Sequence, residues 1–122
     1  MSKKRPRDVK VIPRFHLWLE YKGKPVIGKG GAAVLEKIDR YRSISKAAVS
    51  LNLSYSYVWK RLRKMELALG NPLVKTQRGG MGGGGQAILT PLGRRLLWKY
   101  QQVDLKFDKL ATKESSRNLL VK

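Results

Sequence analysis

Apolar side chains recur every three or four residues in two internal stretches, and this spacing predicts two amphipathic helices. The first follows the glycine-rich residues 28–31 and extends to Tyr41, over about three turns. The second extends from Tyr55 to about Leu69 and should turn one stripe of side chains inward. The expected inward stripe consists of Tyr55, Val58, Leu62, Met65 and Leu69.

A shorter helix and a tight turn are expected between these two helices. Ser43 or Ser45 can cap a helix that contains small alanines, which allow a neighbouring element to approach closely. The turn covers Asn52 to Ser54, and the Ser54 hydroxyl is expected to cap the following helix. The sequence therefore predicts the order helix, turn, helix.

Two short apolar segments flank a loop that is dominated by glycine. Residues 73–76 and 87–89 read as strands, and the loop of residues 77–86 contains the pattern G-x-G-x-x-G. A dinucleotide site is rejected, because the loop follows no buried parallel strand and leads into a strand instead of a helix. Glycines let a loop tip approach a sugar-phosphate backbone closely. The alternative is a hairpin connection without contacts.

A long final helix is expected over residues 91–111, because Thr90 offers a capping hydroxyl and Pro91 suits the first helical position. Its apolar positions repeat at nearly the 3.5-residue spacing that lets two helices pack side by side. One small domain cannot cover such a stripe, which predicts a homodimer. The expected dimer interface consists of Leu92, Leu96, Tyr100, Val103, Phe107 and Leu110.

The N-terminal part combines a charged start with an alternating segment. Residues 1–10 hold little to bury and are expected to form a disordered basic arm. Period-two alternation between Val11 and Ile27, with a glycine turn, predicts a strand or hairpin. This strand offers an alternative to dimerisation, since it can fold over the apolar stripe of the final helix within one chain.

Together these elements predict a mostly α fold with small β content. The order corresponds to a winged helix-turn-helix with an N-terminal strand or hairpin and a long C-terminal dimerisation helix. With 122 residues the chain is expected to form one domain over residues 11–111. Residues 112–122 are expected to form a flexible tail.

The charge balance indicates the class of partner. The net charge is +19 and the isoelectric point is near 10.7. Between Arg40 and Val103 the only acidic residue is Glu66. Such an unopposed cationic surface favours nucleic acid over acidic proteins or membranes. A nucleoid architectural protein with little sequence preference, or an RNA-binding protein, remains an alternative.

The helix that extends from Tyr55 to about Leu69, the third in chain order, has the composition of a helix that reads DNA. An α-helix fits the major groove, where its first turns approach base edges. Here hydroxyl and aromatic side chains come first and cations follow, whereas an ordinary solvated helix face usually mixes charges of both signs. The expected DNA contacts are Ser45, Lys46, Ser54, Tyr55, Ser56, Tyr57, Lys60, Arg61, Lys64, Arg78, Gly79, Gly80, Gly82 and Gly83.

Other chemistry finds little support in the sequence. The chain has no cysteine and one histidine, His16, so no metal site and no cofactor are expected. The acidic residues are dispersed, and no enzymatic activity is expected. No run approaches the roughly 18 apolar residues of a membrane span, so the expected location is the cytoplasm, in association with the nucleoid.

Four segments resemble the N-terminal domain of the molybdate-dependent transcriptional regulators of the ModE type, which is itself similar to the LysR-type DNA-binding domain. These segments are residues 44–48, 53–59, 72–85 and 89–93. The resemblance implies a sequence-specific, homodimeric regulator that binds double-stranded DNA with its third helix and wing. The full-length members carry C-terminal oxyanion-binding domains, whereas this chain ends at Lys122. No small-molecule effector is therefore expected.

Overall fold

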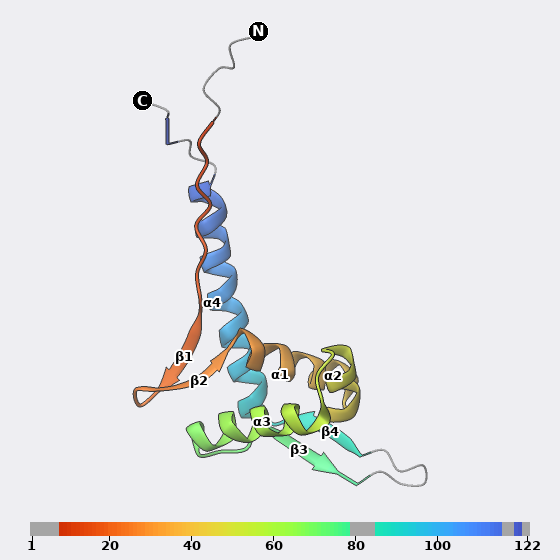
Figure 1. Cartoon of the computed structure of the whole chain (residues 1–122). Helices are drawn as coiled ribbons and strands as arrows, with labels where there is room; N and C mark the ends of the chain where they lie inside the picture. The colour runs from red at the N-terminus through yellow and green to blue at the C-terminus, as the bar shows by residue number, and fades with distance from the viewer. Residues whose placement is uncertain (1–7, 79–84, 116–118, 121–122) are drawn as a thin grey trace.

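The structure, a computed structural model, describes residues 8–78, 85–115 and 119–120. Figure 1 shows a head in which helices pack against a hairpin, and from which the last helix extends as a stalk beside the N-terminal segment. The predicted winged helix-turn-helix with an N-terminal hairpin is confirmed. The elements are β1 (Trp18–Tyr21), β2 (Lys24–Gly28), α1 (Lys29–Tyr41), α2 (Ile44–Ser50), α3 (Tyr55–Leu69), β3 (Val74–Gln77), β4 (Gln86–Leu89) and α4 (Pro91–Ser115).

The core lies where α1, α2 and α3 meet β3 and β4, the two strands of the wing. Val58, Leu62 and Met65 of α3 face it, as predicted. Tyr55 does not, since 49% of its surface is exposed at the first position of α3, so the predicted inward stripe is wrong there. The largest fully buried side chains are those of Ile27, Leu35, Ile38, Leu62, Leu73, Val34 and Val58.

The glycines of residues 28–31 do not simply precede the first helix, because α1 already begins at Lys29. A Cβ atom placed on Gly31 would lie 2.7 Å from the sulfur of Met65. Glycine is a poor helix former, but here the missing side chain allows α3 to pack directly against the first turn of α1. Tertiary packing therefore explains residues that local propensity assigns to a turn.

Serine hydroxyls position the two helices of the helix-turn-helix. The Ser43 side chain accepts a hydrogen bond from the Lys46 amide at 3.1 Å, so Ser43 is the cap of α2. The Ser54 side chain accepts one from the Tyr57 amide at 3.0 Å, as predicted. Between the helices Asn52 adopts a φ of 57°, a left-handed conformation that asparagine tolerates well.

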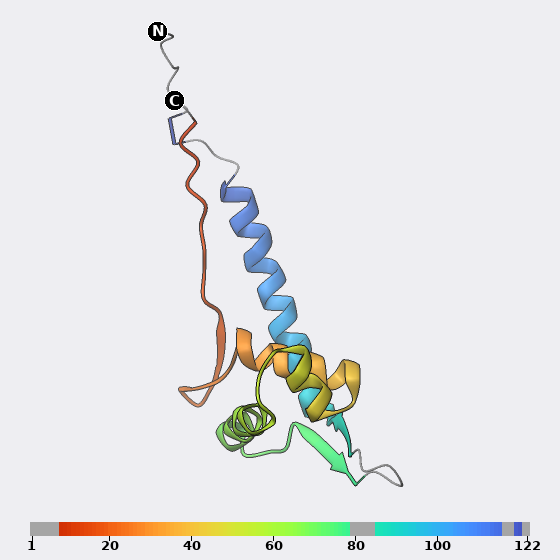
Figure 2. The same cartoon turned by 45° about the vertical axis from the view of Figure 1, so that its right-hand side comes forward.

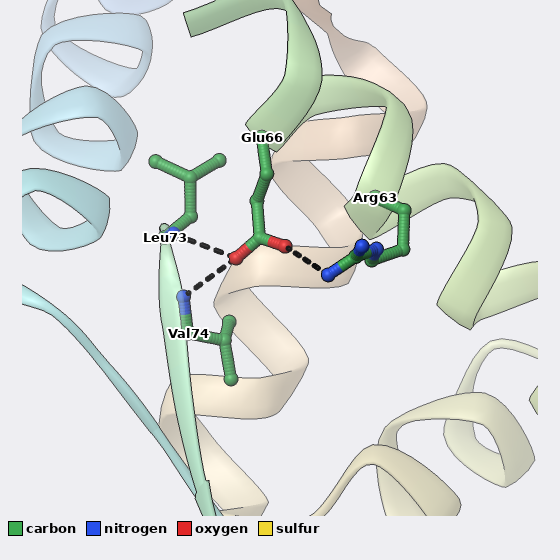
Figure 3. Close-up of polar contacts among 4 residues, drawn as sticks. All are labelled: Arg63, Glu66, Leu73 and Val74. Carbon is green, nitrogen blue, oxygen red and sulfur yellow. Dashed lines mark hydrogen bonds and ion pairs between the residues drawn. The ribbon is translucent and has the colours of Figure 1, made fainter. Parts of the chain in front are cut away.

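Glu66 connects α3 to the start of the wing (Figure 3). One carboxylate oxygen accepts hydrogen bonds from the Leu73 amide at 2.8 Å and the Val74 amide at 3.4 Å. The other lies 4.0 Å from the Arg63 guanidinium. Hydrogen bonds to a charged group contribute about 1.5 to 3 kcal/mol each, so Glu66 holds β3 in place beside α3.

The first turn of α4 is anchored to the segment before β3. Thr90 accepts a hydrogen bond from the Gly93 amide at 3.0 Å, and its hydroxyl donates to the Pro72 carbonyl at 2.9 Å. The predicted helix start is therefore confirmed. The helix continues to Ser115, past its predicted end at residue 111, so the first residues of the predicted flexible tail are helical.

The N-terminal segment runs beside α4 in both views of the molecule (Figures 1 and 2). The rings of Phe15 and Phe107 lie 5.3 Å apart, and the Tyr100 hydroxyl donates to the Leu17 carbonyl at 3.4 Å. Tyr100 is only 6% exposed, and burial together with the nearby charge of Asp104 raises the pKa of its hydroxyl. Tyr100, predicted to face a second copy, is therefore covered within its own chain.

The predicted disordered arm of residues 1–10 is only partly among the described residues. Residues 8–10 are described, and the Val9 carbonyl accepts a hydrogen bond from the Leu119 amide at 3.0 Å. Residues 1–7 lie outside the described residues. The described start of the N-terminal segment is thus tied to a residue that follows the stalk helix.

Candidate nucleic-acid interface

The outer face of α3 carries a row of exposed polar and cationic side chains. It lies opposite the buried face, because residues three and four positions apart share one side of a helix. This face is hollowed beside Trp59, which is half-buried. The acid within α3, Glu66, is engaged by the wing through one carboxylate oxygen, and its other oxygen lies 4.0 Å from the guanidinium of Arg63, a member of this row. The exposed row consists of Ser56, Lys60, Arg63 and Lys64, together with the apolar Leu67.

Two tyrosines at the start of α3 are each held by a residue one turn further on. The Tyr55 hydroxyl accepts a hydrogen bond from the Trp59 indole at 2.6 Å, and the two rings pack edge to face. The Tyr57 hydroxyl accepts one from the Arg61 guanidinium at 3.1 Å. Both tyrosines stay about half exposed, so they present fixed aromatic surfaces at the end of α3 that is expected to approach base edges.

Arg61 differs from the other predicted contacts on α3. Its side chain is half-buried and lies over Gly30, where an added Cβ atom would meet the guanidinium. Its bond to Tyr57 engages it further within the protein. Arg61 is therefore better placed to position Tyr57 than to contact DNA by itself. The contact with Gly30 could not be predicted from local sequence, because Gly30 is distant from Arg61 along the chain.

A groove between α2, α3 and the wing brings together predicted residues from three elements. Ser45 and Lys46 are exposed on the first turn of α2, and Arg78 is exposed just after β3. The Tyr55 ring lines the same groove, which continues along the strand residues of the wing. The predicted loop contacts Gly79, Gly80, Gly82 and Gly83 lie outside the described residues.

Arg63 and Leu67 belong to the exposed row but were not among the predicted contacts. Both line the hollow together with Lys60 and Lys64, and Leu67 is 76% exposed. Their positions follow from Lys60 by helical spacing of three and seven residues. The signal was therefore present in the sequence, in the spacing rather than in the residue type.

The described part of the chain holds neither a candidate metal site nor a membrane-spanning helix. No three or more His, Asp or Glu side chains there are grouped so that they could hold a metal ion. None of the helices described is both long and apolar enough to cross a membrane. The groups that the candidate interface does offer are hydroxyl, ammonium and guanidinium donors.

A family model of bacterial regulatory helix-turn-helix proteins, the lysR family, matches residues 32–94. The chain belongs to this family. The matched region extends from α1 through the helix-turn-helix and the wing to the first turn of α4. It therefore contains the exposed row of α3 and the groove beside it, whereas the β1–β2 hairpin lies outside it.

Similar proteins support the resemblance to molybdate-dependent regulators. The molybdenum-pterin-binding protein MopB of Rhodobacter capsulatus is 38% identical over 94 residues, which cover 76% of this chain and 34% of MopB. The molybdenum transport protein ModE of Azotobacter vinelandii is 34% identical over 84 residues, covering 69% of this chain and 31% of ModE. The chain thus spans about a third of the length of these relatives.

Solved structures show the same fold at lower identity. The CbnR_DBD–DNA complex has a TM-score of 0.53 and 18% identity, and the match covers 71% of this chain and 92% of that chain. The likeness extends over nearly the whole of the matched chain, so the two proteins share this fold.

Proposed function

We propose that this chain is the DNA-binding part of a homodimeric transcriptional regulator that recognises double-stranded DNA by sequence. The observation that carries the proposal is the exposed row of α3, in which Ser56, Lys60 and Lys64 project from the face opposite the core. An α-helix of this kind fits the major groove. Membership of a family of regulatory helix-turn-helix proteins supports the same role.

The proposed interface makes two kinds of contact with DNA. Ser56 and Tyr57, on the first turn of α3, approach base edges, while the cations behind them contact phosphates or guanine. Lys46 on α2 and Arg78 at the wing contact the DNA backbone on one side of the major groove. In this arrangement base contacts select the sequence, and phosphate contacts supply most of the affinity and fix the register.

Selection from a library of random duplexes tests sequence recognition. We expect repeated rounds of binding to enrich one motif, and Ser56→Ala to relax its preference at a base position by about 1 to 3 kcal/mol. Arg95→Ala, an exposed change on α4, is the control. Enrichment of no motif would support an architectural protein that coats DNA, and stronger binding to RNA competitors would support an RNA-binding protein.

The distal half of the stalk supports the homodimer. Leu92 and Leu96 pack partly against the core of the head, so the apolar residues left for a second copy lie further along α4. Leu110 is 53% exposed and Phe107 is 42% exposed, although Phe107 also contacts Phe15. Burial of each such side chain contributes about 1.5 to 3 kcal/mol. We propose that Val103, Phe107 and Leu110 form the centre of the interface.

Sedimentation at micromolar concentration tests the dimer. We expect the wild type to sediment at twice the 13.9 kDa of one chain and a Val103→Asp, Leu110→Asp variant to sediment as a monomer, because a carboxylate in an apolar interface is costly. Gln101→Asp, an exposed change on the same helix, should leave the dimer intact. A wild type that stays monomeric would contradict the proposal.

Two-fold symmetry links the dimer to the operator. Two copies of α3 on one face of a duplex read half-sites that are centred about 34 Å apart, one helical turn, or a small multiple of it. The enriched motif is therefore expected to be a palindrome with this spacing. It stays a prediction that DNA binding needs no small-molecule effector. The similar proteins MopB and ModE both have names that refer to molybdenum.

A further inference from the structure

The β1–β2 hairpin precedes the region that the family model matches, and its tip is basic. Tyr21 pairs with Lys24, so Lys22 and Gly23 form a two-residue turn, both with positive φ. Both lysines are exposed, and the Lys22 ammonium lies 5.3 Å from the centre of the Tyr21 ring. The acid of the hairpin, Glu20, accepts a hydrogen bond from the Trp18 indole at 2.9 Å.

Packing fixes the hairpin beside α3. Ile27 at the end of β2 is 2% exposed, and it lies with Met65 of α3 around Gly31. Arg61 of α3 lies over the neighbouring Gly30. Since β2 continues directly into α1, the hairpin is a rigid extension of the core and not a separate arm.

The hairpin and the wing lie on opposite sides of α3 in both views (Figures 1 and 2). A major groove is about 12 Å wide and is bordered by one phosphate strand on each side. When α3 occupies the groove, the wing and Arg78 face one of these strands. The hairpin then faces the other.

We propose that the hairpin tip is a second DNA-backbone contact, in which Lys22 and Lys24 bind phosphates on the side of the major groove opposite the wing. Each ammonium that neutralises a phosphate releases condensed counterions, which adds affinity without adding sequence preference. The proposal rests on the proposed function, because it requires α3 to bind duplex DNA.

The other occupant to consider is a protein partner, because Trp18 and Tyr21 are 53% and 43% exposed on the same hairpin. The balance of charge favours DNA. Two lysines stand at the tip, and the one carboxylate of the strands is already hydrogen-bonded to Trp18. A protein partner would leave the DNA affinity of hairpin variants unchanged, so the same experiment distinguishes the two.

The first test is the salt dependence of binding to a random-sequence duplex. The variant is Lys22→Asn, Lys24→Gln, since asparagine accepts the positive φ of the turn. The matched control, Lys106→Gln, Lys109→Gln, removes the same charge from exposed positions of α4. Each phosphate contact contributes about 0.9 to the slope of log affinity against log salt concentration. Because the variant loses two such contacts per protomer, we expect the wild type to lose about 12-fold more affinity per protomer than the variant between 50 and 200 mM salt. The control should follow the wild type.

The second test places the hairpin directly. Because the chain has no cysteine, Lys24→Cys introduces a single thiol for a photo-crosslinker. We expect crosslinks to duplex DNA from this position and none from Lys109→Cys. If the wild type does not bind duplex DNA, the proposed function fails. If it binds while the hairpin variant keeps the wild-type salt slope and Lys24→Cys gives no crosslink, the hairpin proposal alone is overturned.

Discussion

Exchange of Lys60 and Lys64 for glutamate is expected to lower the affinity for duplex DNA by about 10³ at 150 mM salt. Both ammonium groups are exposed at the centre of the outer face of α3, where the proposed interface is closest to the DNA. Reversal of the charge removes two phosphate or guanine contacts and adds repulsion on each protomer. Fluorescence anisotropy with a labelled duplex measures the loss, and circular dichroism checks that the helices persist.

A change of equal charge elsewhere separates position from net charge. Lys106→Glu, Lys109→Glu makes the same substitution on exposed positions of α4, away from the head (Figure 1). We expect it to weaken binding by less than about tenfold, since long-range attraction is screened beyond a Debye length of about 8 Å. Equal losses in both double variants would indicate an architectural protein that binds through its total charge. Unchanged binding by both would exclude α3 as the interface.

Elements whose signals lie close together in sequence were predicted well. The apolar stripe of α3, apart from Tyr55, and the capping hydroxyls of Ser54 and Thr90 each depend on residues within one or two turns, and the structure has them where the pattern predicts. The strand pairing of the wing likewise follows from two short apolar segments around one loop. Local hydrogen bonding and helical periodicity determine these features, so they need no knowledge of the rest of the chain.

Features that depend on distant residues could not be predicted in the same way. The glycine at position 31 reads as a turn residue, yet it lies inside α1 because Met65 packs against it. The stripe of α4 reads as continuous, yet Tyr100 is covered by the N-terminal segment of the same chain. Glu66 reads as a lone acid on a basic helix, yet its carboxylate binds two backbone amides of the wing.

The candidate site shows the same division. Periodicity predicts that Ser56, Lys60 and Lys64 share the outer face of α3, and the structure places them there. The contact of Arg61 with Gly30, and the position of the β1–β2 hairpin across α3 from the wing, follow from how α1 packs on α3. A basic residue in a helix was therefore easier to predict than the partner that orients it.

Gly93→Ala is expected to destabilise the fold strongly, and more than Gly70→Ala. Gly93 is buried in the first turn of α4, and an added Cβ atom would collide with the Leu73 carbonyl oxygen. The Leu73 backbone cannot retreat easily, because its amide donates to Glu66 at 2.8 Å and its carbonyl accepts from the Thr90 amide at 2.9 Å. The contact thus requires α4 to move away from the wing.

We expect Gly93→Ala to cost about 3 kcal/mol or more and to lower the melting temperature by about 10 to 20 °C. Gly70→Ala is the matched control: Gly70 ends α3 with a φ of 74° and has open space around its Cβ position, so only backbone strain of about 1 kcal/mol is expected. Thermal unfolding followed by circular dichroism compares both variants with the wild type. If Gly93→Ala melted at or above the temperature of Gly70→Ala, α4 would not approach Leu73 as closely as the structure shows, and the anchoring of the stalk to the wing would have to be revised.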